Sequence, residues 1–503
     1  MNAAPQADLW LELPENLRRP ALRGIRWTLW LSAAAVPFSF GTRILLARMG
    51  PHVLAVYGLL LVYINFVSAF FLLGGNAVVI RYLPAVPRPR QPAFLRSYAA
   101  VTAAWLALWM LPAWLAPGWL RLLFGSLATA RLCREAVLLA PLVILFSLSL
   151  AALKSLMEID RAQVLYRLVT IGSFGAYGLL FLLARQNFRR HPAAWIGGVY
   201  FSLVAIAGAL ALLRLRARLP RTTRRRWHLP SGFWRFTFSL ESVSMLGFFA
   251  AELDMLFVLH SGGLRRLGGY VAVMTLGLAL VPLLKLLLES LMASLTNALA
   301  LGDLRAGGAL VAAYARLLLP AILLFGAGLA AWAPLWLSIL GAAYTGLSLA
   351  LVLAACGAMI YGLNCLAGSL LSAMGFPQSE LIAKLASIGA FVAAFFPLWR
   401  RDGLLGAVAA WCLAQAVYLA LNGWALLRRA PFPLAWLPRS VSAFFVALTL
   451  AAGLAAALPP GDWLLRVAGW LLPAAAYAAL ARYSPAELRQ LAGLLLPGKF
   501  SLE

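Results

Sequence analysis

The chain has 503 residues, of which 63% are hydrophobic and only 12% are charged, and its mean hydropathy is +0.88. Soluble domains carry about a quarter charged residues, so this composition excludes an ordinary water-soluble protein. The net charge of +26 would suit nucleic acid, but basic residues also collect in the cytoplasmic loops of membrane proteins, where they meet anionic lipids. We therefore expect the phospholipid bilayer, and no nucleic acid, as the partner of this basic surface.

Apolar runs recur along nearly the whole chain, and each is long enough to cross the hydrocarbon core as a helix. They predict an all-α, polytopic membrane protein with about 14 transmembrane helices. The four cysteines have no metal-ligand spacing, so neither a metal site nor a disulfide framework is expected. The predicted spans are approximately 26–47, 53–79, 97–117, 135–153, 164–184, 194–213, 236–260, 269–294, 309–331, 346–371, 383–399, 405–427, 440–458 and 464–482.

The longest basic connection follows the sixth span and combines a run of arginines with two prolines. It divides the chain into a predicted cytoplasmic N-terminal segment (1–25), an N-lobe of six spans (26–213), the Arg-rich linker (214–235), a C-lobe of six spans (236–430), two extra spans (431–482) and a cytoplasmic amphipathic tail (483–503). In the tail, Ser484 and Glu487 form a capping-box start for a short surface helix.

The distribution of Lys and Arg predicts the orientation. With the N-terminus inside, 28 of the 42 basic residues fall in cytoplasmic segments and 12 in the opposite loops. Positive charge is retained on the cytoplasmic side, so we expect both termini to be cytoplasmic.

Two segments of the first half recur in the second half. GTRILLARMGPHVLAVYG, at residues 41–58, matches ELDMLFVLHSGGLRRLGGY, at residues 252–270, with an offset of 211 to 213. SLMEIDRAQVLYRL from Ser155 aligns with SAMGFPQSELIAKL from Ser372 at an offset of 217. An offset of six spans keeps both halves in the same orientation. The repeat therefore predicts two parallel six-helix lobes around a central cavity, as in transporters, followed by two extra C-terminal helices.

Four of the 16 acidic residues fall within the seventh and eighth spans: Glu241, Glu252, Asp254 and Glu289. A charge at the bilayer centre costs at least ~2.5 kcal/mol, so these side chains should face protein, a cavity or each other. Glu241 and Glu252 share one helix face, and Lys285 is spaced to pair with Glu289. A Glu241–Lys285–Glu289 cluster is expected. These carboxylates are candidates for gating or ion coupling, although a purely structural ion network fits equally well.

Arg43 lies late in the first span, at a depth equivalent in the repeat to that of Asp254. We expect Arg43 to pair with Glu252 or Asp254 when the outer side is closed, and to bind a phosphate group when that pair opens. The alternative is that Arg43 snorkels to the headgroups. Arg48 and Arg81 flank the first hairpin and, with the lysine of the eighth span, are further phosphate-binding candidates. The carboxylates could also bind a coupling H⁺ or Na⁺, and no other cofactor is expected.

The run RILLARMGPHVLAVYGLLLVYINFVSAFFLLGGNAVVIRYLPA, at residues 43–85, resembles the opening of polysaccharide and O-antigen flippases. These belong to the multidrug/oligosaccharidyl-lipid/polysaccharide (MOP) flippase superfamily. The Leu-Ala-Arg before Gly50, the Tyr57-Gly58 pair and the Arg-Tyr-Leu-Pro exit carry the resemblance, which extends loosely to about residue 430. It implies a transporter that moves a polyprenyl-pyrophosphate-linked oligosaccharide to the outer leaflet of the bacterial inner membrane by alternating access. Polysaccharide polymerase or assembly proteins are the implied partners.

Other functions stay open. A drug or cation antiporter of the same superfamily would normally have twelve spans, and the lipid II flippase branch has a more acidic first-hairpin motif that this chain lacks. A polytopic glycosyltransferase or polymerase is disfavoured, because the outer connections are short and contain no paired carboxylates. Neither a Gly-rich phosphate loop nor a nucleophile triad is evident, so no catalytic residue is assigned and we expect a transporter rather than an enzyme.

Overall fold

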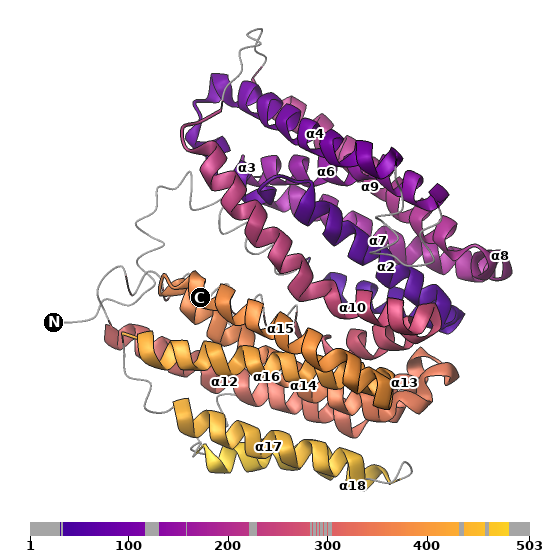
Figure 1. Ribbon diagram of the computed structural model, residues 1–503, viewed down its shortest axis with the longest axis vertical. Coiled ribbons are helices and arrows are strands. Elements are labelled where there is room, and N and C mark those ends of the chain that lie inside the picture. Colours follow the sequence, from indigo (N-terminus) through magenta and orange to yellow (C-terminus); the bar gives the residue numbers. More distant parts are fainter. Residues whose placement is uncertain are drawn as a thin grey trace, which may run out of the picture. The chain divides into compact units, whose positions relative to one another are not determined.

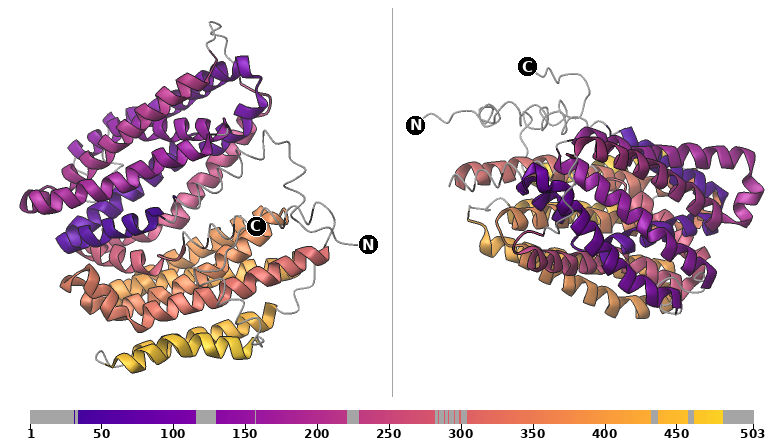
Figure 2. Two further views of the ribbon diagram at one scale, coloured as in Figure 1. Left: turned by 180° about the vertical axis from the view of Figure 1, so that it is seen from behind. Right: turned by 90° about the horizontal axis from the view of Figure 1, so that it is seen from above.

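The computed structural model describes residues 31, 34–115, 130–156, 158–220, 229–281, 284, 288, 291, 295, 299, 304–431, 437–457 and 462–481. Every regular element within these residues is a helix (Figures 1 and 2). They fall into two compact units, Met1–Gly268 and Gly269–Glu503.

The first unit is a bundle in which α6 and α9 pack against each other and against α2 and α7. Its large apolar side chains are also found on the outside, where Leu182 is 77% exposed, as expected of helices that contact lipid. The elements are a helix at 34–49, α2 (Pro51–Phe70), α3 (Gly75–Ala85), η2 (Arg88–Arg90), α4 (Gln91–Leu115), α6 (Ala130–Ser155), α7 (Ile159–Leu183), α8 (Arg185–Arg190), α9 (Pro192–Arg218) and the first part of α10 (Phe233–Gly277).

The second apolar run is a broken helix. The sequence predicts one span over residues 53–79, but α2 ends at Phe70 and α3 begins five residues later, at Gly75. Leu73, Gly74 and Gly75 have positive φ angles of 26°, 79° and 68°, which turn the chain out of the helix. Glycine adopts this conformation without the clash of a Cβ. The prediction of one continuous helix was wrong here, because hydrophobicity continues unchanged through the break.

The helix α10 carries the seventh predicted span and the start of the eighth. Its backbone leaves helical geometry at Gly263, where the sequence predicts the turn between them. Before this kink, rings of α10 pack against the first unit: Phe236 lies 5.6 Å from Tyr82 and Phe248 lies 5.6 Å from Phe66, between ring centroids. These contacts group the seventh span with the first unit, although the repeat assigns it to the C-lobe. The lobe boundaries stay a prediction.

The second unit is built on α14, α15 and α16, which pack against one another, and on α12. The two extra spans, α17 and α18, pack together and against α12. Arg466 of α18 donates to the Ala331 carbonyl at 2.5 Å, and Trp470 Nε1 donates to the Leu324 carbonyl at 2.8 Å. The elements are α12 (Leu304–Ala331), α13 (Ala333–Leu340), η4 (Ala342–Leu347), α14 (Ser348–Ala373), α15 (Pro377–Asp402), α16 (Leu404–Arg429), α17 (Leu437–Ala457) and α18 (Trp463–Leu480).

Twelve of the described helices are long and apolar enough to cross a membrane, judged by length and composition. Most of their bounds lie within a few residues of the prediction, as for 404–429 against the expected 405–427, but 51–70 ends nine residues before the predicted 79 and 88–111 begins nine residues before the predicted 97. The helix at 34–49 falls in the predicted first span and residues 269–281 in the predicted eighth. The all-α, multi-pass membrane fold is therefore confirmed. The N-terminal segment, most of the arginine run of the linker and the amphipathic tail lie outside the described residues.

Candidate functional site

A buried carboxylate lies at the break between α2 and α3. Glu241 of α10 is 3% exposed, and its Oε2 accepts a hydrogen bond from the Gly74 backbone nitrogen at 2.7 Å. Gly74 is the residue before α3, so the carboxylate meets the N-terminal end of that helix. The first amides of a helix lack partners inside it, and the helix dipole favours negative charge there. The second oxygen, Oε1, is buried without a hydrogen-bond partner.

The missing side chain at position 74 lets α10 approach the break closely. A Cβ there would lie 2.6 Å from Val78 Cγ2 and 3.1 Å from both Cγ2 and the carbonyl oxygen of Thr237. Thr237 precedes Glu241 by about one helical turn. It is fully buried, and its Oγ1 has no hydrogen-bond partner. Two side-chain oxygens on one face of α10 are therefore buried beside the break without partners.

Aromatic side chains of α4 contact the backbone carbonyls of the break. The Tyr98 hydroxyl oxygen lies within 3.3 Å of three carbonyl oxygens, those of Leu72, Leu73 and Gly75. A hydroxyl carries one proton, so it can donate to only one of them at a time. Trp105 Nε1 donates to the carbonyl of the last residue of α2 at 2.8 Å. Side chains of α4 thus contact the carbonyls of the break, and the Leu72 carbonyl also accepts from the Gly75 backbone nitrogen at 2.9 Å.

The other two carboxylates of this helix are also buried. Glu252 is 7% exposed and accepts a hydrogen bond from Asn65 Nδ2 of α2 at 2.6 Å. Asp254 is 9% exposed, and its Oδ1 accepts from the Met255 backbone nitrogen at 2.7 Å. Glu252 and Glu241 both face the chain segment formed by α2, the break and α3. Asn65 is a partner that sequence reasoning missed, because a single asparagine in an apolar run does not reveal what it contacts.

Arg43 is half-buried in the helix at 34–49 and contacts the Tyr57 hydroxyl of α2. Tyr57 packs edge-on against Tyr177 of α7, with ring centroids 6.3 Å apart. In this structure Glu252 is bonded to Asn65. The pairing of Arg43 with Glu252 or Asp254, expected when the outer side is closed, stays a prediction.

The two weaker arginine candidates lie at the surface of the first unit. Arg48 is exposed, and its carbonyl accepts a hydrogen bond from Arg189 at 3.5 Å. Arg81 of α3 is also exposed, and the carbon of its guanidinium group lies 4.2 Å from the centroid of the Phe236 ring. This is cation–π geometry, which fixes the plane of the guanidinium group.

The eighth predicted span carries the remaining candidates. Lys285 and Glu289 lie outside the described residues, so their pairing and the cluster with Glu241 stay predictions. The described positions between Leu284 and Leu295 are buried leucines of the second unit's core.

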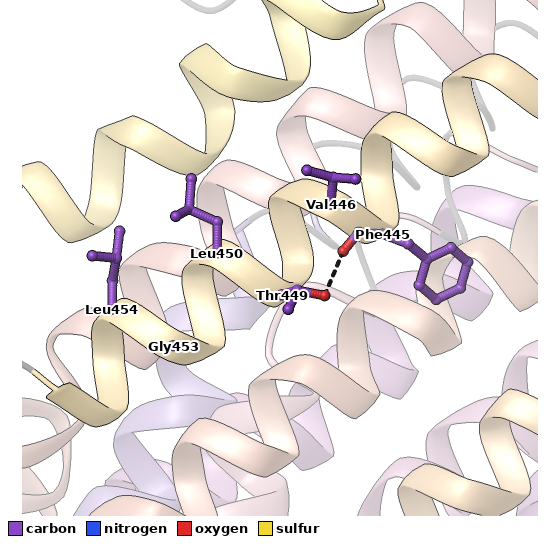
Figure 3. Close-up of a pocket in the computed structure, with 6 residues that line it drawn as sticks. All are labelled: Phe445, Val446, Thr449, Leu450, Gly453 and Leu454. Carbon is purple, nitrogen blue, oxygen red and sulfur yellow. Dashed lines mark hydrogen bonds between the residues drawn. The ribbon is translucent and has the colours of Figure 1, made fainter.

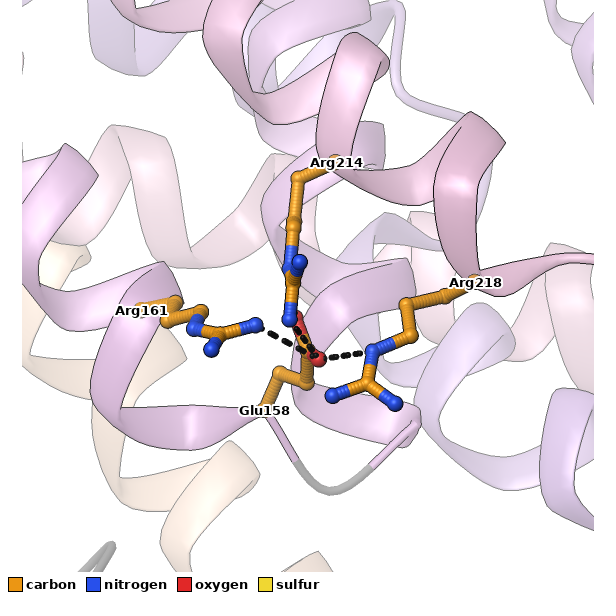
Figure 4. A network of polar contacts seen from close by, with 4 residues as sticks. All are labelled: Glu158, Arg161, Arg214 and Arg218. Carbon is orange, nitrogen blue, oxygen red and sulfur yellow. Dashed lines mark hydrogen bonds and ion pairs between the residues drawn. The ribbon is translucent and has the colours of Figure 1, made fainter.

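Sequence reasoning passed over another buried carboxylate, Glu158, at the turn between α6 and α7. It is 7% exposed and pairs with three arginines (Figure 4). Arg161 lies at 3.1 Å on the next turn, and Arg214 of α9 binds both carboxylate oxygens at 2.9 Å. Arg218, also of α9, completes the group. The available signal was the repeat segment beginning at Ser155, which contains this glutamate.

The second unit has a similar arrangement made from different residues. Glu380 of α15 accepts hydrogen bonds from Ser372 at 2.9 Å and from Tyr418 of α16 at 3.1 Å, and it pairs with Lys384 at 2.8 Å. In both units a carboxylate near the turn between the fourth and fifth predicted spans of the half contacts the sixth. At the offset of 217 these two carboxylates do not align, because Glu158 falls on Gly375, so the repeat stays a prediction.

An apolar pocket of about 620 Å³ lies along one face of α17 (Figure 3). Its only polar side chain, Thr449, donates to the Phe445 carbonyl of its own helix at 2.9 Å. Such a lining suits lipid chains rather than a charged cargo. The lining residues are Phe445, Val446, Thr449, Leu450, Gly453 and Leu454.

No protein-family model matches the sequence, and no curated protein matches it. Solved structures do match the fold. The lipid II flippase MurJ, in an inward closed conformation, has a TM-score of 0.67 at 10% identity, over 90% of this chain and 98% of that chain. An inward-facing multidrug resistance MATE family transporter of the MOP superfamily has a TM-score of 0.64 at 13% identity, over 80% of this chain and 98% of that chain. The chain has the MOP-superfamily fold.

A third MOP-fold structure, a transporter from Pyrococcus furiosus, has a TM-score of 0.56 at 13% identity and covers 88% of this chain and 100% of that chain. The superfamily suggested by residues 43–85 is thus supported at the level of the fold. The fold does not distinguish the polysaccharide and O-antigen branch from the other branches of the MOP superfamily.

Proposed function

We propose that this chain is a transporter that flips a polyprenyl-pyrophosphate-linked oligosaccharide, or exports a polysaccharide precursor, from the cytoplasmic to the outer leaflet. The main support is the MOP fold combined with the first-hairpin sequence at residues 43–85. MurJ, one of the fold neighbours, is by name a flippase of a lipid-linked molecule. We place the chain in the bacterial inner membrane with both termini in the cytoplasm, and polysaccharide polymerase or assembly proteins are its proposed partners.

The proposed mechanism is alternating access. Two lobes rock around a polar cavity that holds the sugar and pyrophosphate, while the polyprenyl tail stays in lipid. Arg43, Arg48, Arg81 and Lys285 are the proposed pyrophosphate ligands. For Arg81, stacking on Phe236 orients the guanidinium group without using its N–H donors. Those donors match the geometry of phosphate oxygens.

The buried carboxylates of α10 are proposed to act in gating or ion coupling. Glu241, Glu252 and Asp254 are each less than a tenth exposed, in a helix long and apolar enough to cross the membrane. A carboxylate buried in a membrane-spanning helix costs free energy, which favours a role beyond helix packing.

The test is reconstitution of the purified protein in liposomes with a labelled polyprenyl-pyrophosphate oligosaccharide. Transfer is scored by access of a membrane-impermeant glycosidase to the label. We expect protein-dependent transfer, lowered about tenfold or more by Arg81→Gln through loss of a charge-assisted contact. Arg401→Gln is the matched control, because Arg401 is 83% exposed at the end of α15. If no glycan type is transferred at all, the proposed cargo is wrong.

A drug or cation antiporter of the same superfamily is the alternative. Its support is the likeness to MATE transporters, together with the excess of buried carboxylates over buried basic side chains on α10. Proton-coupled dye efflux from the same liposomes, lost in Glu252→Gln, would favour it. Lipid II is a third cargo to include in the flipping assay. Turnover of the oligosaccharide to a longer product would instead indicate a polymerase or glycosyltransferase.

A further inference from the structure

We propose that the group of arginines around Glu158 binds the phosphate of one anionic phospholipid, whose acyl chains lie against α7 and α9. This arginine cluster consists of Arg161, Arg214 and Arg218. It takes no part in the transport mechanism proposed above. Lipid binding at the cluster requires no cargo, so it can be measured separately.

The cluster holds more positive charge than its carboxylate neutralises. Three guanidinium groups surround the single carboxylate of Glu158, which leaves a surplus of two positive charges. Lys154 in the last turn of α6 and Asp160 in the first turn of α7 add one charge of each sign, so the surplus remains. Like charges at this separation repel each other. A phosphodiester carries one negative charge and would reduce this repulsion.

The carboxylate also orients the arginines for a second acceptor. The three side chains converge on Glu158 from different sides (Figure 4). Arg218 contacts the carboxylate through Nε and Arg161 through one terminal nitrogen, Nη1, so each has further N–H groups that can donate to another anion. Both side chains are about half exposed, whereas that of Glu158 is buried beneath them. The planar guanidinium group matches phosphate oxygens, and arginines already held in place lose less entropy when they bind one.

The surroundings of the cluster favour a lipid over a soluble phosphate. Arg161 lies at the beginning of α7 and Arg218 at the end of α9, two helices that are long and apolar enough to cross a membrane and that pack together. Exposed apolar side chains continue from the cluster along both helices, on α7 at spacings that place them on the face of Arg161. They are Val164, Leu168 and Ile171 on α7, and Ile206, Leu210 and Leu213 on α9.

This arrangement places a basic site next to an apolar surface, which matches the headgroup and the acyl chains of one phospholipid. In the orientation proposed above, this end of the helices lies at the cytoplasmic leaflet, where anionic lipids attract basic residues.

The experiment captures the lipid by photocrosslinking. The full-length protein is placed in phosphatidylcholine nanodiscs that contain a small fraction of radiolabelled phosphatidylglycerol. The photoprobe is introduced as Val164→p-benzoylphenylalanine, about one turn from Arg161. We expect it to capture the label, and unlabelled phosphatidylglycerol, but not added phosphatidylcholine, to compete. The same photoprobe at Leu179, an exposed residue about 27 Å from Arg161 along α7, should capture no lipid selectively.

Charge variants then test the arginines themselves. Arg161→Gln and Arg218→Gln should each weaken the capture of phosphatidylglycerol at position 164 about fivefold, the contribution of one basic residue near an anionic membrane surface. Arg216→Gln is the matched control. Arg216 is an exposed arginine of α9 that lies between Arg214 and Arg218 in sequence but on another side of the helix. This variant removes the same charge at the same depth and should keep the wild-type capture.

Three results would overturn the proposal. Equal capture of phosphatidylglycerol and phosphatidylcholine at position 164 would refute a site for anionic lipid. Equal losses in Arg216→Gln and Arg218→Gln would indicate a diffuse basic surface in place of a defined site. Displacement of the lipid by millimolar sn-glycerol 3-phosphate would show that the cluster binds a soluble phosphate. Thermal unfolding of each variant in lipid-free detergent verifies that it is folded.

Discussion

Two adjacent glycines make it possible to separate the packing of α10 against the break from the backbone conformation of the break. Gly74 and Gly75 have nearly equal left-handed φ angles of 79° and 68°. Alanine at either position costs about 1–2 kcal/mol, because its Cβ crowds the following carbonyl in this conformation. A Cβ at position 75 meets no atom within 4 Å, whereas one at position 74 would lie 2.6 Å from Val78 Cγ2 and 3.1 Å from the Thr237 carbonyl.

We therefore expect Gly74→Ala to lower the free energy of unfolding by about 1–3 kcal/mol more than Gly75→Ala, the usual range for an overpacked core. Val78 and Thr237 are both fully buried, so neither can move aside into open space. The assay is thermal unfolding of both variants and the wild type in the same detergent, followed by tryptophan fluorescence. Adding Val78→Ala to Gly74→Ala should restore part of the loss, because it removes the closest atom. Equal losses for the two glycine variants would refute the close approach of α10 to residue 74.

Three further predictions concern other described contacts. Gly406→Ala should destabilise the hairpin of α15 and α16 by about 2 kcal/mol or more in thermal unfolding, because a Cβ there would lie 2.0 Å from the Leu398 carbonyl oxygen. Gly389→Ala on α15 is the control. Its Cβ meets no atom within 4 Å, so this variant should be neutral or slightly stabilising. Glu158→Gln should lower the free energy of unfolding by about 2 kcal/mol, because it leaves mutually repelling guanidinium groups without their carboxylate. If the variant melts at the same temperature as the wild type at low salt, this prediction is wrong. Tyr98→Phe should cost about 1–3 kcal/mol by leaving the buried Leu73 carbonyl without its side-chain donor, and hydrogen exchange should rise locally at the break rather than across the bundle.

The positions of the membrane helices could be predicted well because each depends on one quantity, the length of an apolar run between polar or glycine-containing turns. The predicted turn at Gly263 and the span at 405–427 are examples. The break after Phe70 could not be predicted in this way. It changes backbone geometry without changing hydrophobicity, and glycines are also common inside unbroken membrane helices.

The candidate site was only partly accessible to sequence reasoning. A carboxylate in an apolar run must be buried or paired, which correctly drew attention to Glu241 and Glu252. Their partners are the Gly74 backbone amide and the Asn65 side chain, and no sequence pattern indicates either contact. Glu158 and Glu380 were missed because they lie at span ends, where charged residues are ordinary. Only the three-dimensional convergence of side chains from other helices distinguishes them.

The interruption between α2 and α3 also has a mechanical consequence. An intact helix resists bending because each turn is tied to the next by backbone hydrogen bonds, and that ladder is missing over residues 72–74. The stiffness of the second span is therefore low at this one point, so α2 and α3 can tilt as separate rods. The bond between Gly74 and Glu241 fastens the start of α3 to α10. Glu252 of α10 also holds Asn65 of α2, so a displacement of α10 would act on both α2 and α3, and the break would accommodate a difference in their tilt.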